Sequence, residues 1–199
     1  MVLIPKILHM IWIGPTPFPY EANFNSYRKK HPGWQIHLWT DKNLPALQNK
    51  KIYDSIPIWT TKADLLRLEI LAKYGGVYVD VDSVCLKPID KLIKNESCFF
   101  STNHKGKIEI NFMGCGKNNK TIKRLIRKFP HYWQRITKQK KELSVYCIYS
   151  YIRKRINAAE YTKLPRMYNC TLLEKTEDTY IIQQMAHTWG ENKTFDVFK

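Results

Sequence analysis

The stretch from Thr60 to Asp82 limits most strongly what this chain can fold into. Its first half spaces apolar residues along one broad face at helical intervals, with charged residues at the polar edge. Thr61 followed by Asp64 fits a capping box, and Gly75 and Gly76 tolerate positive φ where the helix must end. The sequence therefore predicts an amphipathic helix that packs on a core and stops at a glycine turn.

The segment 77–82, VYVDVD, follows this turn and predicts a mostly buried strand that runs out into a polar site. Asp80 and Asp82 are two residues apart, so a strand directs both side chains to one face. Two carboxylates on one face repel each other unless a divalent cation lies between them or water screens them. Metal binding is the sharper interpretation, and a hydrated acidic turn is the alternative.

Length and composition indicate a single globular domain over residues 1–199. A chain of 199 residues, 44% hydrophobic and 13% aromatic, is long enough to bury a substantial core. Because no run of about 18 apolar residues occurs, we expect no membrane-spanning helix. The opening MVLIPKILHMIWIG contains Pro5 and has no small-residue cleavage site, so we interpret it as a core strand and not as a signal peptide.

Cysteine usage and charge indicate where such a chain works and what it attracts. The five cysteines are scattered without a CxxC pair, which favours reduced thiols and a cytoplasmic location. The net charge of +16 comes from several basic clusters and predicts attraction to anions. Solvated helix faces account for most of this charge, and phosphorylated ligands, an anionic membrane surface and nucleic acid are the candidate partners for the rest.

Periodicity and turn residues predict alternating strands and helices along the rest of the chain. Strands are expected at 6–13, 34–40, 97–101 and 108–115. Helices are expected at 21–30, 87–94, 120–137 and 143–159, with short helical turns at 41–57 and short strands in the tail from 171. No repeat or linker divides this pattern, which is typical of an α/β layer structure.

Three motifs carry a resemblance to a known family. IPKILHMIWIG, HPGWQIHLWTD and KADLLRLEILAKYGGVYVDVD occur in this order, and INFMGC and AHTWG follow later in the chain. The constellation resembles the DXD-containing sugar transferases of glycosyltransferase family thirty-two, which are related to the catalytic core of the large clostridial glucosylating toxins. The resemblance implies a GT-A type, Rossmann-like fold with a central, mostly parallel sheet flanked by helices, a nucleotide-sugar donor, and Mn²⁺ or Mg²⁺.

The resemblance also implies roles for four charged residues. Asp82 matches the second acid of the DXD motif and is expected to bind the metal directly, while Asp80 matches the first and is expected to reach the metal through water and to accept hydrogen bonds from sugar hydroxyls. Asp64 and Arg67 share a helix face and are expected to grip the donor sugar and its phosphate side. The structural alternatives are a helix cap for Asp64 and an ordinary ion pair for Arg67.

Three further residues are candidates for donor contacts or for the core. Trp12 ends the first strand, where its ring is expected to stack on the nucleobase as the equivalent tryptophan does in the related toxins; a core position is the alternative. His9 is interpreted as a satisfied core or loop histidine. Asn111 is a candidate for contacts with donor or acceptor hydroxyls, although asparagines at strand ends often only make turns.

Two residues near the C-terminus match a family segment that folds over the diphosphate. His187 is expected to complete the metal shell, and the indole N–H of Trp189 is expected to donate to a phosphate oxygen. This chain departs from the family pattern, because Gly190 is followed by Glu-Asn-Lys where the family continues to Ser-Trp. Lys193 is a candidate replacement for part of the lost phosphate contact.

These residues predict a metal-dependent sugar transfer to a glycan or other hydroxyl acceptor, with retention of configuration implied by the resemblance. UDP-sugar is the preferred donor and GDP-sugar the alternative. A metal-dependent nuclease or other phosphoryl-transfer enzyme also uses paired acids, but usually with a third or fourth acid, and none is obvious near Asp80. A non-catalytic basic binding protein is the other alternative. Peripheral contact with an anionic membrane is a further expectation, and nucleic acid is not the expected partner.

Overall fold

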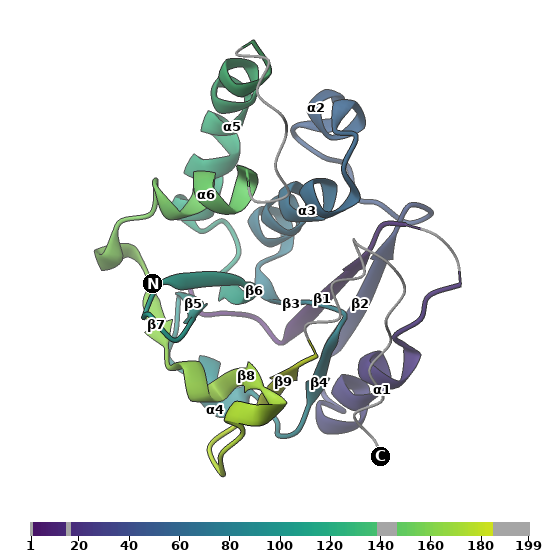
Figure 1. The fold of residues 1–199 in the computed structure, drawn as a ribbon, viewed down its shortest axis with the longest axis vertical. Helices are drawn as coiled ribbons and strands as arrows, with labels where there is room; N and C mark the ends of the chain where they lie inside the picture. Colours follow the sequence, from purple (N-terminus) through teal and green to yellow (C-terminus); the bar gives the residue numbers. More distant parts are fainter. Residues whose placement is uncertain (1, 15–16, 139–146, 185–199) are drawn as a thin grey trace.

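A computed structural model describes residues 2–14, 17–138 and 147–184 (Figure 1). The strands within these residues are β1 Ile7–Trp12, β2 Gln35–Thr40, β3 Gly76–Val79, β4 Ser83–Cys85, β5 Cys98–Thr102, β6 Ile108–Cys115, β7 Thr162–Leu164, β8 Asn169–Thr171 and β9 Ile181–Gln183. The helices are α1 Glu21–Lys30, α2 Lys50–Ser55, α3 Trp59–Tyr74, α4 Asp90–Ile93, α5 Lys120–Lys138 and α6 Cys147–Arg153, with short 3₁₀ helices η1 Ala158–Glu160, η2 Arg166–Tyr168 and η3 Leu172–Glu174.

The central sheet has six strands in the order β2-β1-β3-β6-β5-β7. The β1 strand is parallel to both β2 and β3, β6 is antiparallel to β3 and β5, and β7 is parallel to β5. A second sheet, β4-β9-β8, joins the segment that follows the acidic motif, Asp80 and Asp82, to the tail of the chain. The α/β fold with a mostly parallel central sheet flanked by helices is confirmed.

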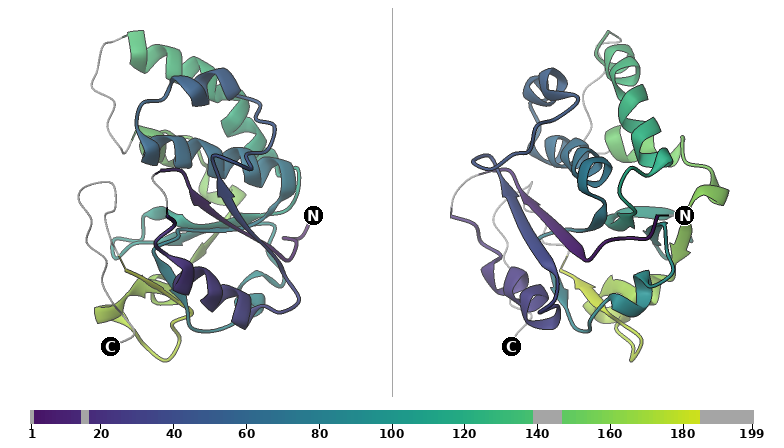
Figure 2. Two further views of the ribbon diagram at one scale, coloured as in Figure 1. Left: turned by 90° about the vertical axis from the view of Figure 1, so that its right-hand side faces the viewer. Right: turned by 180° about the vertical axis from the view of Figure 1, so that it is seen from behind.

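Two apolar clusters lie on opposite faces of this sheet. On one face α3, α5 and α6 pack with Leu65, Phe129 and Tyr151, each at most 1% exposed. On the other face Met10 and Val77 pack with Tyr27 of α1. Figures 1 and 2 show α2, α3, α5 and α6 on one side of the sheet, and α1, α4 and the small sheet on the other. The strands β1, β3, β5 and β6 are thus mostly buried on both faces, which explains their largely apolar sequences, whereas the edge strand β2 has no fully buried residue.

The glycine turn after α3 is confirmed, but the predicted cap is wrong. Gly75 and Gly76 have φ of 69° and 95°, and the N–H of Gly75 closes the helix on the carbonyl of Leu71. At the other end, α3 begins at Trp59 after an extended Ile58, with no side-chain cap. The apolar pattern extends the helix past the polar residues that resemble a capping box, so Thr61 and Asp64 lie inside it.

Most other elements lie where the sequence predicts them, and the differences concern short segments. The predicted helix at 87–94 is the four-residue α4, and within the described residues the helix predicted at 143–159 is α6. The strand β4, directly after the acidic motif, was not predicted, because three residues are too few to show a period. Among the described residues no helix is long and apolar enough to cross a membrane. All five cysteines have free thiols.

Candidate functional site

The acidic motif lies in the turn between β3 and β4. The sequence placed Asp80 and Asp82 on the strand itself, but β3 ends at Val79 and both acids follow it. The N–H of Asp80 donates to the Asn111 carbonyl at 2.9 Å, and the Ser83 hydroxyl donates to the Asp80 carbonyl at 2.5 Å. Pairing with two other segments therefore fixes the backbone here, and the turn replaces strand alternation in positioning the two carboxylates.

A buried ion-pair chain joins α3 to the first acid. Nη2 of Arg67 lies 2.7 Å from Oδ1 of Asp64, and Nη1 lies 3.2 Å from Oδ1 of Asp80. The exposed fraction of the side chain is 8% for Arg67, 10% for Asp64 and 30% for Asp80. Nη1 also donates to the Ile110 carbonyl at 2.6 Å, and the guanidinium lies 4.3 Å from the centre of the Tyr78 ring. The chain places one cation between two acids and leaves Asp80 the most accessible of the three.

Burial dominates the protonation of this group. It raises the pKa of Asp64 to about 7, although Arg67 opposes the shift. It also raises the pKa of Asp80, against Arg67 and the hydroxyl of Tyr78, which donates to Asp80 Oδ1 at 2.7 Å. The pKa of Tyr78 is raised by burial as well, so this phenol stays a hydrogen-bond donor. Carboxylates that are desolvated to this degree gain from any further cation that binds beside them.

The second acid lies in a turn that is anchored from both sides. Asp82 is half-buried, and its carbonyl accepts the N–H of Gln184 at 2.9 Å. The side-chain amide of Asn23 donates to the Val81 carbonyl at 3.0 Å and to Oε1 of Gln184 at 2.9 Å. Helix α1 and the end of β9 thus hold the turn that presents Asp82.

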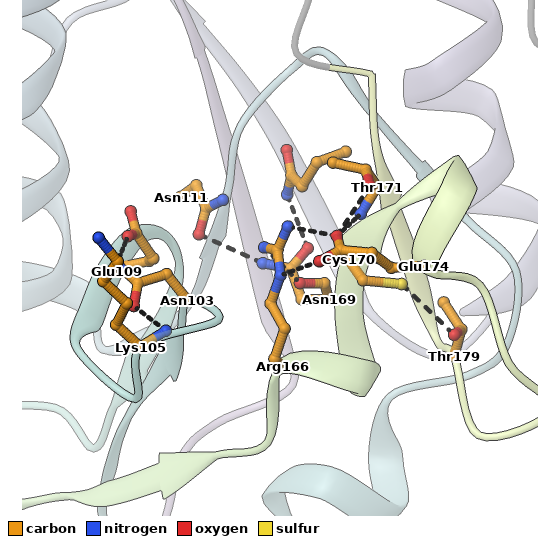
Figure 3. A network of polar contacts seen from close by, with 11 residues as sticks. Asn103, Lys105, Glu109, Asn111, Arg166, Asn169, Cys170, Thr171, Glu174 and Thr179 are labelled. Carbon is orange, nitrogen blue, oxygen red and sulfur yellow. Dashed lines mark hydrogen bonds and ion pairs between the residues drawn. The ribbon is translucent and has the colours of Figure 1, made fainter.

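Asn111 lies beside the motif, on β6. Its Oδ1 accepts from the Ser101 hydroxyl at 2.9 Å and from Nδ2 of Asn169 at 3.2 Å, and its carbonyl accepts from Asp80. Figure 3 shows Asn111 and Asn169 directed toward each other from β6 and β8. The structure therefore brings Asn111 to the site, where it also links the site to the small sheet.

Trp12 and His9 lie on β1 but have different surroundings. Trp12, which is half-buried, meets Phe18 and Tyr20 edge-on, with ring centroids 5.9 and 5.8 Å away. His9 is fully buried, as predicted: Nε2 contacts the Gly75 carbonyl at 2.9 Å and Nδ1 accepts from Trp39 at 3.1 Å. Burial lowers the pKa of His9 to about 4. His9 thus closes the glycine turn as a neutral side chain, while stacking of Trp12 on a base stays a prediction.

His187, Trp189 and Lys193 lie outside the described residues, so their roles stay predictions. The contacts that Tyr78 and Asn23 make at the site were not predicted from the sequence. Tyr78 is two residues before Asp80, so strand alternation was a usable signal for it. Asn23 is 58 residues from the carbonyl it binds, and no local pattern marks that contact.

The residues present fit a divalent cation whose remaining ligands come from the substrate and from water. Among the described residues, no three His, Cys, Asp or Glu side chains cluster as a metal cage. Mg²⁺ usually takes one or two carboxylates together with phosphate oxygens and water, and does not need an all-protein cage. The oxygens of Asp80 and Asp82 suit such a hard cation.

Comparison with solved structures identifies the fold. The chain superposes on the PaToxG glycosyltransferase with a TM-score of 0.60 at 16% identity, covering 77% of this chain and 69% of that one. It superposes on the galactosyltransferase LgtC with a TM-score of 0.55 at 10% identity, covering 89% and 86%. The fold is GT-A.

Sequence comparisons agree with this fold over the first half of the chain. Residues 17–99 match the family model of the glycosyltransferase sugar-binding region containing the DXD motif. Inositol phosphoceramide mannosyltransferase 1 of Schizosaccharomyces pombe is 37% identical over 103 residues, covering 47% of this chain and 32% of the relative. Uncharacterized glycosyltransferase L373 of Acanthamoeba polyphaga mimivirus is 34% identical over 99 residues, covering 43% and 38%. The chain thus spans about a third of the length of these relatives.

Proposed function

We propose that this chain is a glycosyltransferase domain that moves a sugar from a nucleotide-sugar to a hydroxyl acceptor. The observation that carries the proposal is the chain of Asp64, Arg67 and Asp80 beside Asp82, at the end of β3 in a GT-A fold. The match of residues 17–99 to the DXD region supports it independently. Membership of family thirty-two and the relation to the clostridial toxins are part of the proposal and rest on the motifs.

Each side chain of the site has a role in this reaction. Asp64 accepts hydrogen bonds from sugar hydroxyls, and Arg67 holds Asp64 and Asp80 in place by offsetting their mutual repulsion. Asp80 and Asp82 would hold Mn²⁺ or Mg²⁺, which when bound supplies Lewis-acid stabilisation of the negative charge on the leaving diphosphate. Trp12 offers a ring to the base. Asn111, which is half-buried beside the motif, is the candidate contact for a donor or acceptor hydroxyl, and the buried Asn169 holds its side-chain oxygen in place.

The relatives support mannose as the transferred sugar. Several are named as mannosyltransferases, among them the inositol phosphoceramide mannosyltransferases of S. pombe. We therefore propose a mannosyl donor and a polyol or glycan hydroxyl as acceptor, with retention of configuration. We keep a cytoplasmic location, which rests on the free thiols, as a proposal. The preference for UDP in the sequence analysis rests on Trp12 and the Asp64–Arg67 pair. These residues do not distinguish uracil from guanine, so GDP-mannose is to be tested beside UDP-sugars.

The alternative classes have less support. A two-metal nuclease needs more acids around its metals, and within the described residues no group of three metal-binding side chains occurs. A non-catalytic basic protein has no need of two acids buried around one arginine, because such a group is costly to desolvate.

The test is hydrolysis or transfer of GDP-mannose and UDP-sugars by the full chain, with Mn²⁺ and with EDTA. Asp82→Asn removes a metal ligand and is expected to lower turnover by about 100-fold or more, because charge on the leaving diphosphate is then less stabilised in the transition state. Asp178→Asn, in an exposed loop, is the matched control and is expected to keep full turnover. Turnover that survives EDTA, or that Asp82→Asn leaves intact, refutes the assignment. Stabilisation by GDP or UDP only with Mn²⁺ would support the site separately from turnover.

A further inference from the structure

A cavity of about 100 Å³ lies between α5 and α6, apart from the acidic motif. It is lined by Arg124, Leu125, Lys128, Tyr151 and Arg155. Three of these five side chains are cationic. The proposed transfer reaction has no use for this cavity, so its charge requires a separate explanation.

Two guanidinium groups are held rigidly at this cavity. Arg124 makes a two-pronged ion pair with Glu160, with Nη2 2.6 Å from Oε2, and Nη2 also donates to the Arg155 carbonyl at 3.2 Å. The Arg155 guanidinium lies 4.5 Å from the centre of the Tyr151 ring and 5.3 Å from that of Tyr132. Because the Arg155 guanidinium is already ordered, an anion that binds it costs little additional side-chain entropy.

Lys128 is different, because it has no structural partner of this kind. Its side chain is exposed, and in the described part of the chain it forms no ion pair. Among the described residues, the three cations pair with one carboxylate, that of Glu160, so two positive charges at the cavity are not offset. A concave surface lined by one sign of charge concentrates counter-ions.

The outer face of α5 extends this charge along the whole helix. The sequence KTIKRLIRKFPHYWQRITK has seven Lys or Arg and no acid. The exposed positions follow helical spacing and form one ridge about 27 Å long, which carries the four basic residues Lys120, Lys123, Arg127 and Lys138 with His131 and Gln134 between them. The opposite face, with Leu125, Phe129 and Trp133, is buried in the core. The helix is therefore fixed with its cationic side toward solvent.

We propose that the cavity between α5 and α6 binds a phosphomonoester, either free or on a lipid headgroup. The fork of Arg124 already binds Glu160, so the groups that face a phosphate are the Arg155 guanidinium, whose geometry matches phosphate oxygens, and the Lys128 ammonium. Their two uncompensated positive charges suit a doubly charged group. The volume suits one phosphate group and not a whole nucleotide. The ridge shows no exposed Phe, Tyr or Trp on which bases could stack, which disfavours single-stranded nucleic acid as the ligand. The inference goes beyond the proposed transfer reaction and does not depend on it.

The experiment uses the full chain and two kinds of probe. Inorganic phosphate is titrated in a thermal-shift assay against chloride at matched ionic strength. Flotation is measured with two kinds of phosphatidylcholine vesicle. One contains phosphatidic acid, which is a phosphomonoester, and the other contains phosphatidylserine in the amount that gives the same total charge. Lys128→Glu is compared with Lys91→Glu, an exposed lysine of α4 that undergoes the same change of charge.

We expect saturable stabilisation by phosphate and an affinity about tenfold lower in Lys128→Glu than in Lys91→Glu. Preference for phosphatidic acid over phosphatidylserine would identify a lipid headgroup, and phosphate binding without flotation would identify a soluble ligand; either supports the site. Equal weakening by the two variants, or no effect of phosphate beyond that of chloride, overturns it. Binding of an oligonucleotide that depends on Lys128 and displaces phosphate would assign the face to nucleic acid and also overturn it.

Discussion

Replacing Arg67 by methionine tests whether the buried ion-pair chain has the energetics that the structure indicates. The change leaves two carboxylates, of which Asp64 is 10% exposed, without their shared cation. Breaking a buried pair by removing one partner costs about 3–5 kcal/mol, and the low exposure means that solvent screening reduces this little. Uptake of a proton by Asp64 offsets part of the cost, so we expect the free energy of unfolding to fall by about 3 kcal/mol.

Urea and thermal unfolding, followed by circular dichroism, measure this loss. For a chain of this size, about 3 kcal/mol corresponds to a fall in Tm of about 6–12 °C. Arg127→Met, on the exposed face of α5, is the matched control, and its effect should stay within about 0.5 kcal/mol.

A double-mutant cycle separates the ion pair from lost packing. Adding Asp64→Asn to Arg67→Met removes one stranded charge, so we expect the double variant to be at least about 1 kcal/mol more stable than additivity predicts. If Arg67→Met lies within about 1 kcal/mol of wild type, or if the two changes are additive, the chain is not a coupled buried network and the reasoning fails.

The remaining predictions concern the glycine turn. Gly76→Ala directs a Cβ at the Ile7 carbonyl from a residue with φ of 95°, so β1 and β3 must separate. We expect the free energy of unfolding in urea to fall by at least about 2 kcal/mol. Gly33→Ala, which has open space around its Cβ, is the control and should change stability little. An equal effect of the two would contradict the close approach. The neutral, buried His9 has a folded pKa of about 4 against 6.5, so below pH 6.5 the unfolded state takes up the proton first. Stability should therefore fall by up to about 3 kcal/mol from pH 6.5 to 4. In urea unfolding measured across this pH range, His9→Gln should lose that part of the dependence of stability on pH. An unchanged pH dependence in this variant would exclude His9 as its source.

The sequence by itself determined the local elements and the chemistry they carry. Apolar spacing and two glycines specify α3 and its end, because helix propensity and positive φ are properties of neighbouring residues. The spacing of Asp64 and Arg67 also fixes their common helix face, and the acids mark a polar site wherever the strand ends.

Only the tertiary structure decided which distant groups meet at this site. The antiparallel register of Val79 with Phe112 brings Asn111 to the backbone of Asp80, and Arg67 reaches the Ile110 carbonyl across 43 residues of sequence. The pairing of β4 with β9 places the tail beside the motif. Such contacts depend on how two whole layers pack on the sheet, and that packing leaves no period or motif in the short segments it joins.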